Sequence, residues 1–453
     1  MVRGSSLLTA LLAASAYAWM PEHRELSAFN RTSNYLSRRA HSLPNWKVRG
    51  VNLGGWLLSE PWMMNEEWKT MGCGSTCSEF DCVSALGQSK ADKAFNEHYA
   101  RWITPSMIQD MYNAGLNTIR IPIGYWSLRG IVDSSEKFPK MDLQYLDAIV
   151  QKAADLGMFV VMDLHGAPGA QKTLDAFTGQ CLPVSNLPGF FTKYNYDRAA
   201  KWLDWMTRRI HTKPSYKSAV GIIGVVNEPQ TSRDHGGMPK EELDTLTQVY
   251  YPQALKAVRA AEQDLKIPET ERLHVQFMDS LWGAGNPQSH LPRNDTRVVY
   301  DDHNYIGGAV IAKNPNAKQA DYMYYTCFED DRLADNDTPK MVQEWSLTVK
   351  NEYSAEFDWK LVQNEAFYKQ WFAAQQRLYE RTNGWIFWSW RTQLNDPRWD
   401  YSYLVWKKWV PTTAAGLDAS AKQDVCAKYF GNQGMIAKTK VMTLRRGGST
   451  IPL

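Results

Sequence analysis

The sequence has almost no net charge, no internal repeat and, after its first residues, no long apolar run. Its 453 residues include 51 Lys and Arg against 48 Asp and Glu, a formal net charge of +3. A nucleic-acid-binding face usually shows as a basic excess, so nucleic acid is not expected as a partner. No apolar run approaches membrane length, so no membrane association is expected either. No Ser-, Gly- or Pro-rich linker marks a second domain.

Aromatic residues are abundant by contrast, with 19 Trp and 22 Tyr. Flat aromatic rings can stack on sugar rings, and large aromatic side chains also fill protein cores. The composition alone leaves both interpretations open.

The N-terminus has the features of a secretory signal peptide. A short basic start at Met1-Val2-Arg3 precedes an apolar run over residues 7–14 and the small-x-small cleavage pattern Ala16-Tyr17-Ala18. We therefore predict a signal peptide over residues 1–18 and a secreted, extracellular protein, which could be associated with a cell wall. Residues 19–45 form an N-terminal segment and could be a pro-segment that is cut near Arg39, because Arg38-Arg39 is a dibasic pair.

Secretion determines how the six cysteines are interpreted. An even number of cysteines in an oxidising compartment favours disulfides, although spacing does not select the pairing. The cluster near residue 77 lacks the second close pair or the His pair of a typical zinc site, so no metal is expected. The cysteines are Cys73, Cys77, Cys82, Cys181, Cys327 and Cys426. Asn-x-Thr sequons make Asn30, Asn294 and Asn336 candidate glycosylation sites.

Short apolar runs alternate with longer amphipathic segments along the chain. The runs are nearly continuous in apolar residues, as buried parallel strands are. Eight strands alternating with helices predict a single (β/α)₈ barrel with long βα loops, here over residues 46–432, followed by a polar, basic tail at 433–453. The predicted strands are Val48–Leu53, Thr118–Ile123, Phe159–Leu164, Gly221–Val226, Leu273–Met278, Val298–Tyr300, Met341–Glu344 and Trp385–Trp388.

Almost every predicted strand ends in a polar or aromatic group. In a (β/α)₈ barrel the C-terminal ends of the strands meet at one edge, where the active site lies. Eight converging ends are hard to explain by structure alone, although any single one could be an ordinary hydrogen-bonding or ion-pairing residue. The residues at or shortly after these strand ends are, in chain order, Glu60, Arg120, His165, Asn227-Glu228, Asp279, Asp301 to Tyr305, Glu344-Trp345 and Trp388 to Trp390.

Glu228 and Glu344 follow the fourth and seventh strands, which face each other across a barrel mouth. Paired carboxylates suit glycosidic cleavage, in which one protonates the leaving oxygen and the other attacks the anomeric carbon or activates water. Arg120 could keep the nucleophile ionised, whereas the acid needs a raised pKa. Asn227 could bind a sugar hydroxyl, and Trp388 could form the floor beneath the cleaved sugar.

Several motifs together resemble glycoside hydrolase family 5, over a span from about Val48 to Trp409. They are Val48-Arg49-Gly50-Val51-Asn52-Leu53-Gly54-Gly55-Trp56, Asn117-Thr118-Ile119-Arg120-Ile121-Pro122, Asp163-Leu164-His165-Gly166, Asn227-Glu228-Pro229, Glu344-Trp345-Ser346 and Phe387-Trp388-Ser389-Trp390.

The resemblance implies a retaining (β/α)₈ glycosidase with Glu228 as acid/base and Glu344 as nucleophile. It implies a cis peptide bond between Trp388 and Ser389 and no cofactor, since two carboxylates supply both nucleophile and proton. The substrate-binding residues that it implies are Glu60, Arg120, His165, Asn227, His303, Tyr305 and Trp388.

Within the family, the segments Glu60-Pro61-Trp62, His165 to Gln171 and Asp301-Asp302-His303 resemble fungal enzymes that cleave internal β-1,6-glucosidic linkages. Fungal exo-β-1,3-glucanases share Glu60-Pro61-Trp62 and Gly124-Tyr125-Trp126 and are the alternative. We therefore expect a monomer that acts on β-glucan. Transglycosylation uses the same covalent intermediate and stays open, and a non-catalytic glucan-binding wall protein is a remote alternative because both glutamates are present.

Two details depart from the family pattern. Relatives usually have Gly before the nucleophile, where this chain has Gln343; strand alternation predicts that its side chain points outward to the helices. Cys77 and Cys181 resemble additions to the pattern, which suggests that they pair with each other. Beside this resemblance we also expect the pairs Cys73–Cys82 and Cys327–Cys426, although spacing does not select them.

Overall fold

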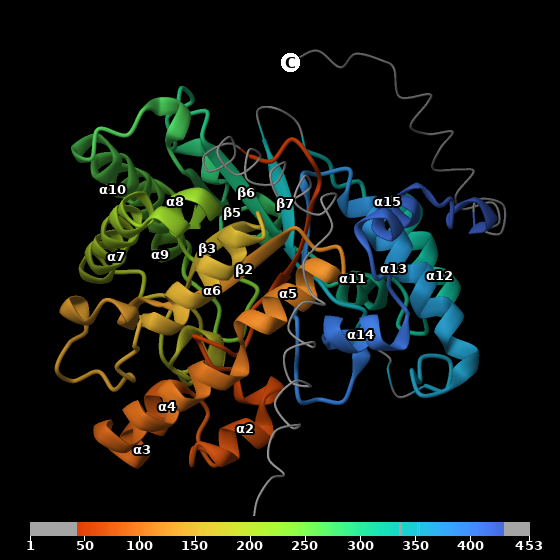
Figure 1. Cartoon of the computed structure of the whole chain (residues 1–453), viewed down its shortest axis with the longest axis horizontal. Coiled ribbons are helices and arrows are strands. Elements are labelled where there is room, and N and C mark those ends of the chain that lie inside the picture. The colour runs from red at the N-terminus through yellow and green to blue at the C-terminus, as the bar shows by residue number, and fades with distance from the viewer. Residues whose placement is uncertain (1–42, 335–337, 351, 353, 430–453) are drawn as a thin grey trace, which may run out of the picture.

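The computed structural model describes residues 43–334, 338–350, 352 and 354–429. Eight parallel strands close into a barrel in sequence order, with helices packed around it (Figure 1). This confirms the predicted (β/α)₈ architecture. The predicted signal peptide, the Arg38-Arg39 pair, the sequons at Asn30 and Asn336 and the C-terminal tail lie outside the described residues.

Each strand begins close to its predicted start, because long buried apolar runs are a strong signal for parallel strands. The strands are β1 (Val48–Asn52), β2 (Thr118–Gly124), β3 (Phe159–Gly166), β4 (Val220–Gly224), β5 (His274–Met278), β6 (Val298–His303), β7 (Lys340–Glu344) and β8 (Gly384–Phe387). Register shifts occur at Ile123/Gly124, Val160/Val161 and Asp302/His303. The last of these lies at the mouth of the barrel and affects which way the neighbouring side chains point.

The lower barrel interior is a compact apolar layer. It contains Val48, Phe159, Val161, Ile222, Val299, Met341 and Ile386, all at most 4% exposed. Inward-pointing residues recur every second position along each strand. Apolar side chains therefore fill the lower part, and polar residues follow nearer the C-terminal ends.

Helices form the outer layer. Their bounds are α2 (Asn65–Thr70), α3 (Glu79–Leu86), α4 (Gln88–Trp102), α5 (Pro105–Asn113), α6 (Gln144–Asp155), α7 (Lys193–Thr212), α8 (Pro214–Ala219), α9 (Lys240–Thr245), α10 (Tyr251–Asp264), α11 (Ile306–Lys313), α12 (Gln319–Tyr324), α13 (Glu365–Tyr379), α14 (Tyr401–Lys407) and α15 (Ala414–Lys422). Strands β5 and β6 are joined by short single turns at Ser280–Trp282 and Pro287–Ser289 rather than by an α-helix.

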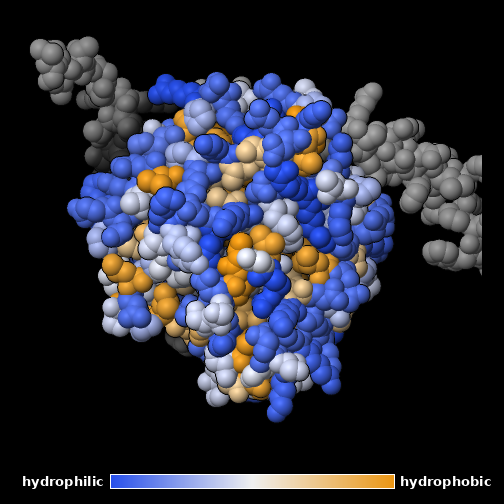
Figure 2. All heavy atoms as spheres, turned by 90° about the vertical axis from the view of Figure 1, so that its left-hand side faces the viewer, coloured by the Kyte–Doolittle hydropathy of each residue, from blue (hydrophilic) through white to orange (hydrophobic). Residues whose placement is uncertain are grey.

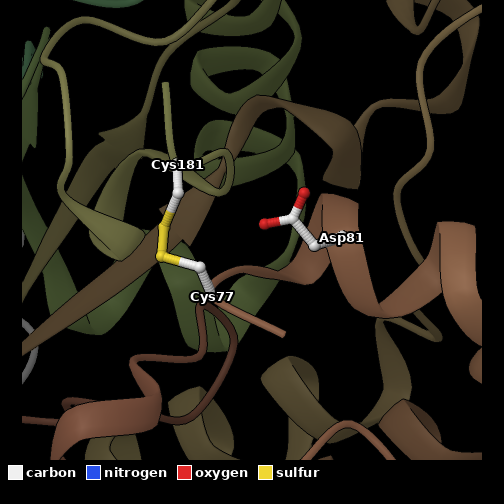
Figure 3. Close-up of side chains that lie close together, drawn as sticks. All are labelled: Cys77, Asp81 and Cys181. Atoms are coloured by element: carbon white, nitrogen blue, oxygen red, sulfur yellow. A yellow bond between two sulfur atoms is a disulfide. The ribbon is translucent and has the colours of Figure 1, made fainter. Parts of the chain in front are cut away.

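The long segment after β1 is helical rather than an extended loop. It contains α2, α3 and α4, which lie together at the lower edge of Figure 1. The Cys73–Cys82 disulfide links the α2–α3 turn to α3, and Cys77–Cys181 ties this segment to the loop after β3. Figure 3 shows the second bridge with Asp81 nearby; because both sulfur atoms are bonded to each other, they leave no thiolate for a metal.

The third bridge, Cys327–Cys426, joins the segment after α12 to the one after α15. All six cysteines are thus paired as the resemblance implied.

The abundant tryptophans are mainly core residues. Eight of them are among the largest fully buried side chains: Trp56, Trp68, Trp102, Trp126, Trp202, Trp345, Trp371 and Trp385. On the face shown in Figure 2, polar side chains predominate and apolar ones form small groups. Within the described residues, no helix is both long and apolar enough to span a bilayer.

Candidate active site

The carboxylates of Glu228 and Glu344 meet at the mouth of the barrel, with His303 between them. One oxygen of each carboxylate and a ring nitrogen of His303 all lie within 4.8 Å of one another. His303 Nδ1 is 2.7 Å from Glu228 Oε1 and 3.5 Å from Glu344 Oε2. Residues more than a hundred positions apart are thus brought together because β4, β6 and β7 end at the same edge.

Glu344 is held by two further groups. Arg120 donates from Nη1 to Glu344 Oε1 at 2.9 Å, and the Tyr305 hydroxyl donates to Oε2 at 3.0 Å. Arg120 is fully buried and also donates to Asn52 and Asn227 at 2.9 and 2.7 Å. A buried guanidinium with this many acceptors has a single orientation, and so it fixes the nucleophile candidate in place.

Asp163 connects Arg120 to His165. Its Oδ2 lies 2.9 Å from Arg120 Nη2 and 2.7 Å from His165 Nδ1. Burial opposes ionisation of Asp163, but the neighbouring Arg120 and His165 outweigh it and lower the pKa of this carboxyl. The His165 ring in turn stacks on Trp388, with ring centroids 5.6 Å apart and planes at 8°. Asp163 and His165 therefore connect Arg120 to Trp388, which forms the floor of the site.

The peptide bond between Trp388 and Ser389 is cis, as the resemblance implied. Glu228 itself has a φ of +39°, a left-handed conformation that is unusual for a residue other than glycine. Such strained residues cluster at functional sites, where the surrounding contacts hold them.

Glu60 lies at the edge of this cluster and is only 5% exposed. Its Oε2 accepts a 2.9 Å hydrogen bond from Trp62 Nε1, whereas Oε1 is buried with no hydrogen-bond partner in the described part of the chain. Burial raises the pKa of Glu60 to about 8, and the charges of Glu344, Asp175 and Glu228 act in the same direction. An unpaired buried carboxyl oxygen in the segment after β1, next to the mouth of the barrel, is suited to binding a sugar hydroxyl.

The free protein does not have the pKa values expected from the sequence for the two glutamates. Burial raises the pKa of Glu344, although His303 and Arg120 oppose it. Burial acts in the same way on Glu228, but the His303 hydrogen bond and the charges of Lys172 and His303 lower its pKa to about 2. Neighbouring Glu344 and Asp301 raise the pKa of His303 well above its usual value in spite of burial. Both directions favour a protonated His303 beside an ionised Glu228 in the free protein.

The prediction for Gln343 was wrong. Its amide donates to Gln276 Oε1, and Gln276 in turn donates to Asp301 at 2.9 Å, so Gln343 points into the barrel beneath the site. The alternation should be counted from Met341, which belongs to the inner apolar layer. The side chain of Glu344 reaches the site because β7 ends there, next to the register shift in β6.

Several strand-end residues do not join the site. Asp279 pairs with Lys340 at 3.2 Å, and Asp302 pairs with Arg332. Asn304 donates to Asp330 at 3.0 Å, and Trp345 packs against Phe372 and Tyr379 in the helical layer. The alternation of side chains along a strand explains why only part of each strand end faces the mouth.

Sequence reasoning named Asp163 and Asp301 without assigning them a role, and it did not name Lys172. Asp163 and Asp301 each stand two positions before a site histidine, and this spacing places both side chains on one face of a strand. That signal could have identified them. Lys172 follows β3 in a loop, where no periodicity predicts its direction.

Two close carboxylates at the mouth of a (β/α)₈ barrel are the arrangement that glycoside hydrolases use to cleave a glycosidic bond. Comparison with known proteins agrees: residues 83–393 match the family described as Cellulase (glycosyl hydrolase family 5). The chain belongs to glycoside hydrolase family 5 and is a glycosidase.

Two of its relatives are proteins of the fungi Neosartorya fischeri and Aspergillus fumigatus. The chain is 43% identical over 429 residues to a Neosartorya fischeri protein named "Probable glucan endo-1,6-beta-glucosidase B", covering 94% of this chain and 100% of that protein. It is 27% identical to an Aspergillus fumigatus protein named "Probable glucan 1,3-beta-glucosidase A", covering 82% and 89%. The structure of rutinosidase from Aspergillus niger has the same fold, with a TM-score of 0.62 and 19% identity over 81% of this chain and 98% of that one.

Proposed function

We propose that this protein is a secreted, retaining β-glucanase that cleaves internal β-1,6-glucosidic linkages. The observation that carries the proposal is the Glu228–His303–Glu344 arrangement with Arg120 on Glu344. The identity of 43% to a relative with an endo-1,6 name supports the linkage. Three disulfides support an oxidising compartment, in agreement with the predicted signal peptide.

The spacing of the carboxylates supports retention. Retaining glycosidases have carboxyl groups about 5–5.5 Å apart, and inverting enzymes about 6.5–9.5 Å apart, to leave room for water. Here an oxygen of Glu228 and an oxygen of Glu344 lie within 4.8 Å. We assign Glu344 as nucleophile because Arg120 and Tyr305 donate to its two oxygens and orient it.

We assign Glu228 as acid/base and His303 as the group that stores its proton. An ionised Glu228 beside a protonated His303 carries the same number of protons as a protonated Glu228 beside a neutral His303. Transfer along the 2.7 Å hydrogen bond from Nδ1 to Oε1 interconverts the two forms. Substrate binding excludes water, which disfavours separated charges and favours the form with the proton on Glu228.

The reaction then proceeds in two steps. Glu344 attacks the anomeric carbon while Glu228 gives its proton to the leaving oxygen, and a glycosyl–Glu344 ester forms. In the second step Glu228 accepts a proton from water, the water oxygen attacks the anomeric carbon, and the bond to Glu344 breaks. The two glutamates supply both nucleophile and proton, so this mechanism needs no metal or organic cofactor. The shell of Glu60, His165, Asn227, Tyr305 and Trp388 would hold the sugar at the point of cleavage.

The deciding experiment is product analysis with linear β-1,6-glucan and linear β-1,3-glucan, using Glu344→Gln as the inactive control. We expect short β-1,6-linked oligosaccharides to appear early and the β-1,3-glucan to stay intact. Release of glucose alone from the β-1,3-glucan would overturn the linkage and indicate the exo-acting alternative. Full activity of the control would refute the assignment of the nucleophile.

A second measurement tests the acid. Glu228→Ala should lose most activity on glucan, where the leaving group needs protonation, and keep formation of the intermediate from activated aryl glucosides. An equal loss of that step on both substrates would show that Glu228 is not the acid.

A further inference from the structure

Lys172 approaches the oxygen of Glu228 that His303 does not hold. Its Nζ is 3.7 Å from Glu228 Oε2, whereas His303 Nδ1 lies 2.7 Å from Oε1. Each oxygen of this carboxylate therefore faces a different nitrogen. The Lys172 side chain is only 14% exposed, so its charge acts on Glu228 with little screening by solvent.

The ammonium is shared among several anions. Asp175 lies 3.4 Å away and Asp234 3.7 Å away, and Glu228 completes the set of three carboxylates. None of these contacts is short. The centroid of the Trp282 ring lies 5.0 Å from Nζ, which adds a favourable cation–π contact. The three carboxylates and the Trp282 ring together determine where the Lys172 ammonium lies.

The charge of Lys172 has a direct effect on Glu228. Burial disfavours the ammonium, but Glu228, Asp175 and Asp234 raise the pKa of Lys172, so it stays charged. Its positive charge in turn helps to lower the pKa of Glu228. The other titratable groups that act on Glu228 come from the ends of four strands and the segments after them. They are Glu60 after β1, His165 from β3, Asp175 after β3, His303 from β6, Tyr305 after β6 and Glu344 from β7.

We propose that Lys172 is a positioning residue for the second step of the reaction, holding Glu228 ionised and oriented so that it can accept a proton from water. This inference rests on the proposed function. The reason for such a group is that the two steps place opposite demands on Glu228, which must be protonated in the first step and ionised in the second. When the ester forms, Glu344 loses its charge, and Lys172 remains as a fixed charge that favours ionised Glu228.

The test is the pH dependence of two rates in Lys172→Met. The alkaline limb of kcat/KM on a β-1,6-oligosaccharide reports loss of the proton that His303 and Glu228 share in the free enzyme. The acidic limb of kcat on an activated aryl glucoside, where hydrolysis of the ester is limiting, reports ionised Glu228. Without the lysine charge both limbs should move to higher pH, by about one unit. Lys172→Arg keeps the charge and should move them much less.

Lys240→Met is the matched control, because this lysine is 78% exposed and pairs with Asp244 on α9. It should leave both limbs unchanged. Asp175→Asn gives a second route that does not depend on the folding of Lys172→Met: it removes a competing anion, so it should move both limbs to lower pH. A uniform loss of activity in Lys172→Met with unmoved limbs would overturn the proposal.

Failure of the proposed function has a different signature. Glu228→Gln should remove the alkaline limb altogether on an activated substrate. If that limb persists, Glu228 is not the acid, and the proposed function fails. If it disappears while Lys172→Met and Asp175→Asn leave the wild-type limbs in place, only the role of Lys172 is wrong.

Discussion

Glu60 makes the stability of the protein depend on pH in a way that can be calculated. Its carboxyl has a pKa of about 8 in the folded protein, against a reference value of 4.5, because it is buried. A carboxyl with a raised pKa binds its proton more tightly in the folded state. The contribution of Glu60 to the free energy of unfolding is therefore most favourable below pH 4.5. This contribution is lost progressively as the pH rises toward 8.

The size of this effect follows from the two pKa values. A difference of one between the pKa of the folded and the unfolded protein corresponds to about 1.36 kcal/mol. The wild type should therefore lose about 4 kcal/mol of unfolding free energy between pH 5 and pH 8.5 through Glu60. Glu60→Gln removes the ionisable group, and its amide oxygen can still accept from Trp62 Nε1. The variant should gain stability over the wild type as the pH rises, by roughly that amount.

Urea unfolding with the disulfides intact, at pH 5 and at pH 8.5, measures the difference between variant and wild type. Titratable groups that do not interact with Glu60 contribute equally to both proteins and cancel. Glu97→Gln is the control, since the side chain of this α4 glutamate is 57% exposed. The difference in unfolding free energy between this variant and the wild type should be the same at both pH values. A Glu60→Gln difference that does not change with pH would refute the reasoning.

Three further predictions concern the site and its supports. Arg120→Lys cannot reproduce the contacts with Glu344 and its neighbours, so kcat/KM on glucan should fall at least about 100-fold, equivalent to about 3 kcal/mol, without a matching rise in KM; near-normal kinetics would contradict this role. Replacing Cys77 and Cys181 by Ser opens a bridge of sequence separation 104, which should lower the unfolding free energy in urea by about 4 to 5 kcal/mol; an unchanged midpoint would count against it. Trp62 is 43% exposed at the edge of the site, so Trp62→Ala should raise KM for long oligosaccharides more than for an aryl glucoside in steady-state assays, and equal effects would show that it contacts no extended chain.

For Glu228 and Glu344, the sequence predicts that they lie together, and the structure shows which residues contact them. Asn227-Glu228-Pro229 and Glu344-Trp345 each follow an apolar run, and the barrel topology alone predicts that the runs end at one edge. The structure adds His303 between them and the contact of Lys172 with Glu228. It also reverses the expected order of their pKa values, because a pKa depends on burial and on every nearby charge, and neither is encoded by local sequence.

Gln343 shows the limit of the periodic pattern. Counting along β7 from Glu344 predicts an outward side chain, yet Gln343 reaches Gln276 inside the barrel. Alternation holds only while the strand continues, and β7 ends at Glu344 beside a register shift. The error therefore arose at the end of the strand, which is where the site lies.

The eight strands, the barrel, the family and the two glutamates could all be predicted from the amino-acid sequence, because apolar runs and family motifs are local and continuous along the chain. Three-dimensional coordinates were needed to establish which strand-end side chains face the mouth, which oxygen each donor reaches, and in which direction burial and nearby charges shift each pKa. These depend on register, burial and the charges of residues far apart in sequence, as in the contact between Arg120 of β2 and Glu344 of β7.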